Sequence, residues 1–444
     1  MFFFPVERQI ENAPPTIWIF FLTSLYILSQ AFDLFLFHCL VDIHLAVVAM
    51  VTMLLSLAVL VRRYVLVCLK ALKSPLVILS GWGFYLMVNA ALGLNWLTSV
   101  VFLFRFMTAN LIAIEIGILL YHWGKKARYA IGFALLMTFL IITFIWYRRY
   151  VDPTFFNELI PLLRDYKIHP VGAGPRAQGL YVNTNILGFV LVIHAALAIW
   201  YSLHRKWSLL ILPAIWLLAA YGVMKTQSRN ALFGIAWVGL FSTVIYSQRY
   251  VSTQKAMVKA LLVVASLIFI VACLQPIADS LPRRWHRFLN QLLTFDWAMW
   301  DPSIIKQQLQ ILDKARVDIW QAALNYWMRN PWTGVGLGCF YRLPLTIRYH
   351  HAHNFFLNIL VEQGIIGIGF LIAFLAVLVK QMADWRGVGL LACFLCVQLF
   401  EDETTSTTLP IYMSLILGYC FWLVLQNQAT RHTPEMDRNI PRKS

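Results

Sequence analysis

Long runs of apolar residues separated by short polar connections make up most of the chain. About twelve of these runs are near the length of roughly 20 residues that an α-helix needs to cross the hydrocarbon core of a bilayer. The expected spans are 17–37, 44–61, 75–95, 98–121, 129–147, 182–203, 208–224, 230–247, 257–276, 355–380, 387–400 and 409–426. The pattern therefore predicts an all-α, polytopic membrane protein.

Two of the polar connections are much longer than the others. The first covers about 148–181 and the second about 277–353. In the second, Asp301-Pro302-Ser303 has the form of a helix cap followed by a first-turn proline, and Pro331 ends the pattern. Apolar residues recur at helical spacing between these points, with polar residues on the opposite side. This predicts an amphipathic helix on the surface of the protein or the membrane.

Composition supports a membrane protein and excludes other classes. Hydrophobic residues make up 60% of the chain and charged residues only 13%, whereas a soluble domain carries about 25% charged residues. A soluble enzyme, a disordered chain and a disulfide-stapled secreted domain are therefore excluded. The seven cysteines lie almost all in apolar runs without metal-like pairing, so no structural disulfide is expected.

The positions of Lys and Arg predict an orientation. The chain has 36 Lys and Arg against 20 Asp and Glu, a net charge of +16, and short cytoplasmic loops of membrane proteins are enriched in Lys and Arg. With the N-terminus in the cytoplasm, the even-numbered connections are basic, the short outer connections at about 38–43 and 96–97 have no Lys or Arg, and the one at 401–408 is acidic. Both termini are then cytoplasmic and both long loops lie outside. The expected organisation is helices one to nine at 1–276, a periplasmic lid loop at 277–353, helices ten to twelve at 354–428 and a cytoplasmic polar tail at 429–444.

Arginines gather in the long outer loops and at nearby helix ends. Guanidinium groups suit a bidentate hold on phosphate or diphosphate, although a solvated charged surface is the better explanation for any single one of them. Arg229 enters an apolar helix at its N-terminus, where a cation opposes the helix dipole unless an anion is near. Arg316 falls on the apolar stripe of the amphipathic helix. Arg176 and Arg348 lie in the first and second outer loops.

Three histidines at 350, 351 and 353 precede the tenth predicted helix. Their spacing is not a zinc ligand set, so no metal and no cofactor are expected. One imidazole at the membrane boundary, near phosphate-binding arginines, can act as a general base, and the alternative is a histidine hydrogen-bonded at a helix start. The glycine-rich stretch 333–338 lacks the strand and the Lys-Ser/Thr of a phosphate loop, and a flexible turn packing against the lid is expected there.

An ordered set of motifs resembles the superfamily of O-antigen ligases and polymerases, which are bacterial envelope glycosyltransferases. The set comprises RAQGLYVNTNILG at 176–188, Ser228-Arg229, Arg316 with Trp320 followed by NPWTGVG at 330–336, and HNFFL at 353–357 with EQG at 362–364. The first five predicted helices carry no matching motif.

The resemblance implies a metal-independent, inverting transferase in the bacterial inner membrane, with a fold similar to the polyprenol-dependent, GT-C-like glycosyltransferases. Such enzymes take a glycan from undecaprenyl diphosphate at the periplasmic face and deliver it to the lipid A–core oligosaccharide. His353 is interpreted as the base, and Arg229 and Arg316 as diphosphate ligands. Weaker candidates for donor or acceptor binding are Arg176, Arg348, His351, Asn354 and Glu362.

Three alternatives remain open. An O-antigen polymerase would deliver the glycan to another lipid-linked repeat unit, and a protein O-oligosaccharyltransferase would deliver it to Ser or Thr. A transporter is the alternative of a different class, but transporters usually bind at the bilayer midplane on broken helices. The polar candidates here gather at the outer boundary instead, which favours transfer at a surface.

Overall fold

The computed structural model describes residues 68–152, 184–202, 208–226, 228–248, 316–340, 343, 352–382, 384–398 and 408–432. Within these residues the protein is helical and has no strand. Its helices are α6 (Lys73–Leu92), α7 (Trp96–Trp123), α8 (Lys125–Val151), α11 (Thr184–Ser202), α12 (Ser208–Thr226), α13 (Arg229–Gln248), α17 (Phe355–Met382), α18 (Trp385–Gln398) and α19 (Thr408–His432).

Each of these helices coincides with a predicted span. The largest difference is at the end of α19, which the sequence placed at 426 and which ends at His432. The predicted spans 17–37, 44–61 and 257–276 lie outside the described residues. By length and composition, α6, α7, most of α8 and α17 are each able to cross a membrane. The all-helical membrane fold is confirmed for the described part, and the number of twelve spans stays a prediction.

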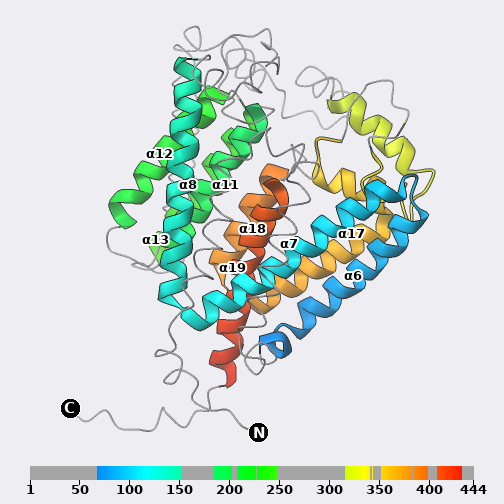
Figure 1. Cartoon of the computed structure of the whole chain (residues 1–444), viewed down its shortest axis with the longest axis horizontal. Coiled ribbons are helices and arrows are strands. Elements are labelled where there is room, and N and C mark those ends of the chain that lie inside the picture. Colours follow the sequence, from blue (N-terminus) through cyan, green and yellow to red (C-terminus); the bar gives the residue numbers. More distant parts are fainter. Residues whose placement is uncertain are drawn as a thin grey trace, which may run out of the picture.

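The helices form two groups with a central pair between them (Figure 1). In one group α6, α7 and α17 pack together, and in the other α11 packs against α8, α12 and α13. Helices α18 and α19 lie between the groups, with α19 running along α7. Small residues allow this close approach: a Cβ on Gly117 of α7 would lie 2.8 Å from the Phe421 Cβ of α19, and one on Gly418 would lie 2.6 Å from Ile116.

The amphipathic helix predicted in the second long loop is present over residues 316–327, and residues 301–315 lie outside the described part. Its predicted apolar face is confirmed there, since Ile319 and Ala323 are buried while Gln321 and Asn325 are exposed. Ile319 and Ala323 pack into a small apolar cluster with the chain ahead of α17. This cluster fixes the helix against the start of α17.

Candidate functional site

A break in α17 receives the glycine-rich loop. Gly364 has a φ of 67°, which interrupts the helix. The loop residues fill the gap in the backbone hydrogen bonding: the N–H groups of Val335 and Gly336 donate to the carbonyls of Val361 and Glu362 at 2.9 and 3.0 Å, and Ile365 N–H donates to the Pro331 carbonyl at 2.9 Å. Residues 331–340 are thereby bound into the middle of a membrane helix.

Glu362 holds the far part of this loop. Its two carboxylate oxygens accept the backbone N–H groups of Gly338 and Phe340, at 2.9 and 3.1 Å, and the side chain is buried. The expectation of a flexible turn against the lid is wrong, because residues 335–340 are all buried and hydrogen-bonded between α6 and α17. The structure thus uses the Glu362 carboxylate to shape the loop, and a direct part in substrate binding stays a proposal.

Three polar side chains of α6, which the sequence analysis missed, bind the loop and the break in α17. The Asn89 amide donates to the Thr333 carbonyl at 2.7 Å, and its oxygen accepts Leu337 N–H at 2.7 Å. Trp82 donates to the Gln363 side chain at 3.0 Å, and the Tyr85 hydroxyl donates to the Gln363 carbonyl. The sequence did contain a hint of this contact: Asn89 is a polar residue inside an apolar span, where burial is costly unless the side chain has hydrogen-bond partners.

The conformation of Gly364 leads to a prediction about stability. A side chain there meets the left-handed strain of about 1–3 kcal/mol and collides with the backbone of Trp332 and Thr333. We expect Gly364→Ala to lower the free energy of unfolding by about 3 kcal/mol or more. Gly369→Ala is the matched control, since it lies on the same helix with nothing within 4 Å of its added Cβ. Equal unfolding temperatures for the two variants in detergent would contradict the described break.

A hydrogen bond joins the helix that carries Arg316 to the segment that carries His353. Trp320 Nε1 donates to the Ala352 carbonyl at 2.8 Å, and Ala352 directly precedes His353. Arg316 lies four residues before Trp320, so the two side chains share one face of the helix 316–327. The two elements are therefore connected directly, and the Arg316 and His353 side chains are both half-buried.

The backbone around His353 is held from both sides. His353 has a φ of 51°, an uncommon conformation in which Asn, Asp and His are enriched among non-glycine residues. Before it, Ala352 N–H donates to the Asn358 side chain at 3.2 Å. After it, the Asn354 side chain accepts Leu357 N–H at 2.9 Å and so caps α17. Asn354 therefore positions the histidine element whatever else it contacts.

A second group of motif residues meets between α11 and α13. A Cβ on Gly188 would lie 2.7 Å from the Ala231 Cβ and 3.2 Å from the Ser228 Cβ, so only glycine fits. The Ser228 hydroxyl accepts Ala231 N–H at 3.4 Å at the start of α13. Arg229 is the first residue of that helix, and its side chain is outside what the structure describes. Gly188, the last residue of the first motif, is thus brought against Ser228 of the second.

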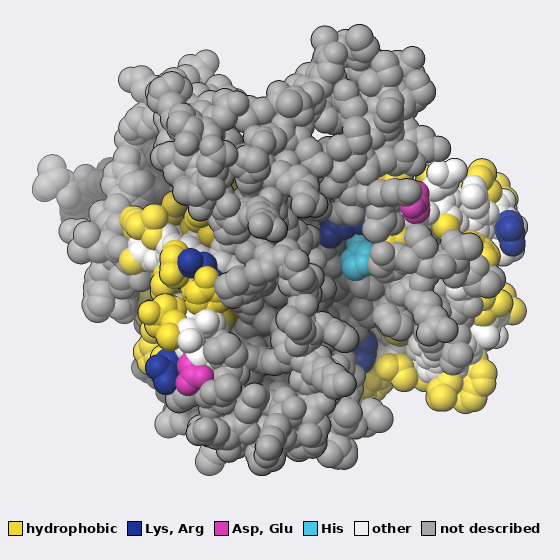
Figure 2. Space-filling model, turned by 90° about the horizontal axis from the view of Figure 1, so that it is seen from above, with side chains coloured by type: hydrophobic (Ala, Val, Ile, Leu, Met, Phe, Trp, Pro, Cys, Tyr) yellow, Lys and Arg dark blue, Asp and Glu magenta, His cyan; other side chains and the backbone are white. Residues whose placement is uncertain are grey.

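Both groups lie at the same end of the bundle. The loop bound into α17 also accepts Leu94 N–H at the Val335 carbonyl, at 3.2 Å, which places the start of α7 at this end. Helix α8 begins where α7 finishes, at the opposite end of the bundle, and therefore runs back toward the start of α7. In the last turn of α8 the Tyr150 ring centre lies 5.2 Å from the Lys225 Nζ of α12. Arg229 begins the next helix after α12. In Figure 2, which looks onto the molecule from above Figure 1, a histidine side chain and basic side chains are visible among the described residues.

The remaining predicted site residues are not placed. Arg176, Arg348 and His351 lie outside the described residues. In the part of the chain that the structure covers, no group of three or more His, Cys, Asp or Glu side chains is arranged to hold a metal ion.

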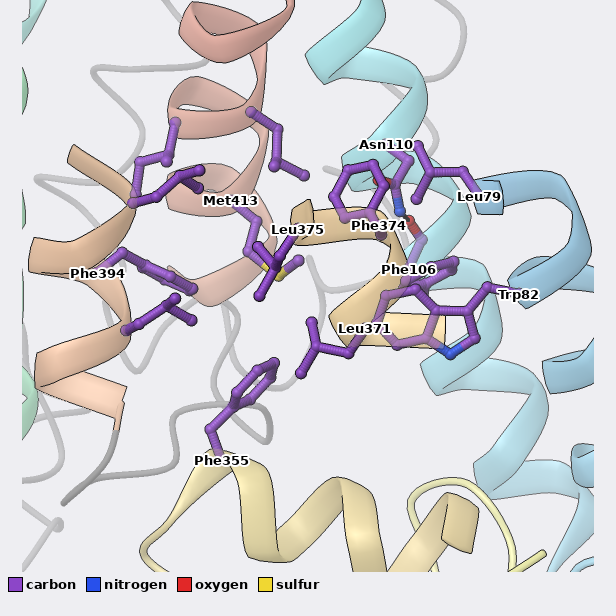
Figure 3. A pocket seen from close by; sticks show the side chains of 14 residues that line it. Leu79, Trp82, Phe106, Asn110, Phe355, Leu371, Phe374, Leu375, Phe394 and Met413 are labelled. Atoms are coloured by element: carbon purple, nitrogen blue, oxygen red, sulfur yellow. Dashed lines mark hydrogen bonds between the residues drawn. The ribbon is translucent and has the colours of Figure 1, made fainter. Parts of the chain in front are cut away.

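An apolar cavity lies beside the histidine element (Figure 3). It has about 500 Å³ of empty space including its open mouth, and it lies between α6, α7, α17, α18 and α19. Phe355 of its lining is close to His353 in the chain, and the single amide in the lining belongs to Asn110. The rest of the lining is leucine, isoleucine, methionine and aromatic side chains, of which Trp82, Phe106, Leu371, Phe374 and Phe394 are labelled in Figure 3.

Comparison with known proteins agrees with this arrangement. Residues 214–372 match the family model described as O-Antigen ligase. The match is shorter than half of the chain, and it includes Arg229, Arg316, His353 and Glu362 but not Arg176. No curated protein matches the chain. The resemblance seen in the motifs is confirmed on this segment, which is similar to the O-antigen ligase family.

Proposed function

We propose that the protein is an O-antigen ligase, which transfers a glycan from undecaprenyl diphosphate to the lipid A–core oligosaccharide at the periplasmic face of the bacterial inner membrane. The observation that carries the proposal is the Trp320–Ala352 hydrogen bond, because it joins the Arg316 helix to the His353 element. Both lie within the segment that matches the O-antigen ligase family.

The proposed reaction is a direct displacement. His353 takes the proton of an acceptor hydroxyl while that oxygen attacks C1 of the donor sugar. The bond from C1 to the diphosphate oxygen breaks, and Arg316 and Arg229 stabilise the negative charge that develops on the leaving undecaprenyl diphosphate. One attack from the face opposite the leaving group inverts the anomeric centre and forms no covalent enzyme intermediate.

The apolar cavity supports a donor with an isoprenoid chain. The lining shared by α6, α7 and α17 to α19 is almost entirely apolar, and it reaches Phe355 next to the proposed base. A few isoprene units of a polyprenol, as many as a space of about 500 Å³ can take, would when held there place its diphosphate at the His353 end of α17. The cavity itself does not distinguish acceptors, so a polymerase or a protein O-oligosaccharyltransferase with the same donor remains the alternative within the transferase class.

A transporter is less well supported by the positions of the candidate residues. Transporter sites lie near the bilayer midplane on discontinuous helices. Helix α17 is broken at Gly364, but the loop residues satisfy the backbone groups of the break, and Gly336 and Val335 are buried there. The proposed base and arginines lie at helix ends instead. The break therefore has a structural role, and the helix ends are the proposed transfer site.

Deletion of the gene, followed by gel analysis of the lipopolysaccharide, tests the proposal. A ligase is expected to leave uncapped core while lipid-linked polymer accumulates. A core bearing a single repeat unit would identify a polymerase instead. An unchanged lipopolysaccharide profile would contradict both and favour protein glycosylation or transport.

The orientation gives a prediction that labelling can check. Because the short basic connections are assigned to the cytoplasm, we expect a cysteine at position 290 to react with an impermeant thiol reagent in intact spheroplasts. A cysteine at position 126, at the start of α8, should react only after permeabilisation. The reverse pattern would put the proposed site in the cytoplasm and exclude a periplasmic acceptor.

We also expect transfer without a divalent metal. Cationic side chains would neutralise the diphosphate, and the three histidines at 350, 351 and 353 lack zinc spacing. Transfer between purified donor and acceptor should therefore keep its rate in EDTA. Loss of transfer that one particular ion restores would show that this expectation is wrong.

A further inference from the structure

We propose that the end of the bundle opposite the candidate site binds an anionic phospholipid through its phosphate headgroup. The site consists of the first turns of α8, the start of α18 and the last turns of α19. Helix α17 separates the two ends, since it runs from the His353 element to Met382, and its part after the break at Gly364, residues 365–382, alone spans about 27 Å. The Lys and Arg pattern assigns the lipid-binding end to the cytoplasm.

The start of α8 concentrates positive charge. Lys125, Lys126 and Arg128 lie in its first turns, which contain no acidic residue. The helix has no side-chain cap, because the capping residue is Gly124. A helix N-terminus already carries positive partial charge, so cations there are unfavourable unless an anion offsets them.

The neighbouring start of α18 differs from the start of α8, because it has a carboxylate beside its arginine. There Asp384 accepts the backbone N–H of Arg386 at 2.8 Å and binds its guanidinium through both carboxylate oxygens. Helix α18 thus begins with its own carboxylate and a paired arginine. Among the described residues no carboxylate forms such an ion pair with Arg128.

Two hydrogen-bond donors without an acceptor among the described residues lie between these two helix starts. The Arg128 guanidinium lies 5.0 Å from the Trp422 ring, and its Nε has no hydrogen-bond partner among the described residues. The fully buried Tyr419 hydroxyl also lacks a partner there, and it is close enough to Arg128 and Arg386 to interact with both charges. Buried donors without acceptors are costly. A phosphate has enough oxygens to accept from both donors, and it would neutralise Arg128, the arginine that lacks a carboxylate among the described residues.

The surface next to this cluster suits a lipid tail. Tyr129 and Phe133 of α8 are 39% and 64% exposed, and they continue the helix face that begins with Lys126. The same face carries the exposed Leu140 and Phe144 further along the helix. A basic headgroup site followed by an apolar stripe is the order of groups in a phospholipid, and inorganic phosphate would use only the first part.

The test is a titration of the full chain in a neutral detergent with short-chain phosphatidylglycerol, with phosphatidylcholine of the same chain length, and with inorganic phosphate. The quantity measured is the concentration that gives half of the maximal rise in unfolding temperature. The variants are Arg128→Gln and Lys126→Gln. Lys126 is exposed, so its replacement should leave the packing intact. Lys380→Gln is the matched control, because Lys380 is exposed in the last turn of α17 at the same end.

We expect a saturable rise with phosphatidylglycerol and none with the other two ligands at the same concentrations. Arg128→Gln and Lys126→Gln should each raise the half-saturating concentration about fivefold, the contribution of one basic residue near an anionic membrane surface. Lys380→Gln should leave it unchanged. Equal effects of the two lipids, saturation by inorganic phosphate alone, or equal behaviour of all three variants would overturn the proposal. None of these outcomes depends on glycan transfer.

Discussion

Replacing His353 by asparagine is expected to lower the rate of glycan transfer by about 10²–10⁴-fold while the lipid-linked donor still binds. Asparagine is the informative replacement, because His353 has a φ of 51° and asparagine adopts that conformation more readily than most residues. The variant therefore keeps the backbone ahead of α17 and loses only the group that accepts a proton. His353→Ala adds backbone strain and should lose at least as much activity.

The control for His353→Asn is the binding of the donor, measured on membrane-inserted protein with an unchanged unfolding temperature. A general base acts in the chemical step, so binding should change little. If the folded variant keeps more than about a tenth of the wild-type rate, which is outside the range for a lost base, His353 only positions a substrate. His351 or Glu362 would then be tried as the base. Glu362 is the poorer candidate, since both of its carboxylate oxygens accept backbone N–H groups.

Replacing Arg316 or Arg229 by alanine is expected to reduce both donor binding and transfer. A guanidinium that holds the diphosphate stabilises the bound donor and, more strongly, the leaving group in the transition state. Charged hydrogen bonds of this kind contribute about 1.5–3 kcal/mol each, which corresponds to roughly a 10–150-fold loss. Lysine should rescue poorly at both positions because a point charge lacks the bidentate geometry of arginine.

Arg329→Ala is the matched control for the Arg316 variants. Arg329 follows the same helical segment and is exposed, and its guanidinium lies 4.9 Å from the Tyr326 ring. Its loss removes one positive charge from the same element without touching the Trp320–Ala352 connection. Equal losses for Arg316→Ala and Arg329→Ala would mean that only the overall charge of this segment matters.

The sequence could predict the helices because their apolar runs are long and nearly uninterrupted. The run that begins at Phe355 shows this: the expected end at 380 lies two residues from the observed Met382. The face of the helix 316–327 was also predictable, since periodicity alone puts Ile319 and Ala323 on the buried side. Such local patterns need no knowledge of distant contacts.

The parts that could not be predicted depend on contacts between distant residues. Nothing local to Gly364 shows that a loop 30 residues earlier in the chain completes its hydrogen bonds, and the apolar residues on both sides of Glu362 and Gln363 hide the break. In the same way, the sequence shows Asn89 only as a polar residue in an apolar helix. Its role is visible only in the structure, where it bonds to Thr333 and Leu337. The motif residues were found by resemblance, and their convergence through Trp320 came only from the fold.

Transfer in proteoliposomes measures the central claim most directly. The purified full chain is supplied with undecaprenyl diphosphate-linked glycan and with lipid A–core oligosaccharide, in parallel with the His353→Asn protein, and the glycan attached to the acceptor is followed on gels. We expect glycan-bearing lipid A–core with the wild-type chain, an inverted anomeric configuration in the new linkage, and at most about a hundredth of that rate with the variant. Absence of product from folded wild-type protein, or equal rates for the two proteins, would contradict a glycosyltransferase site built around His353.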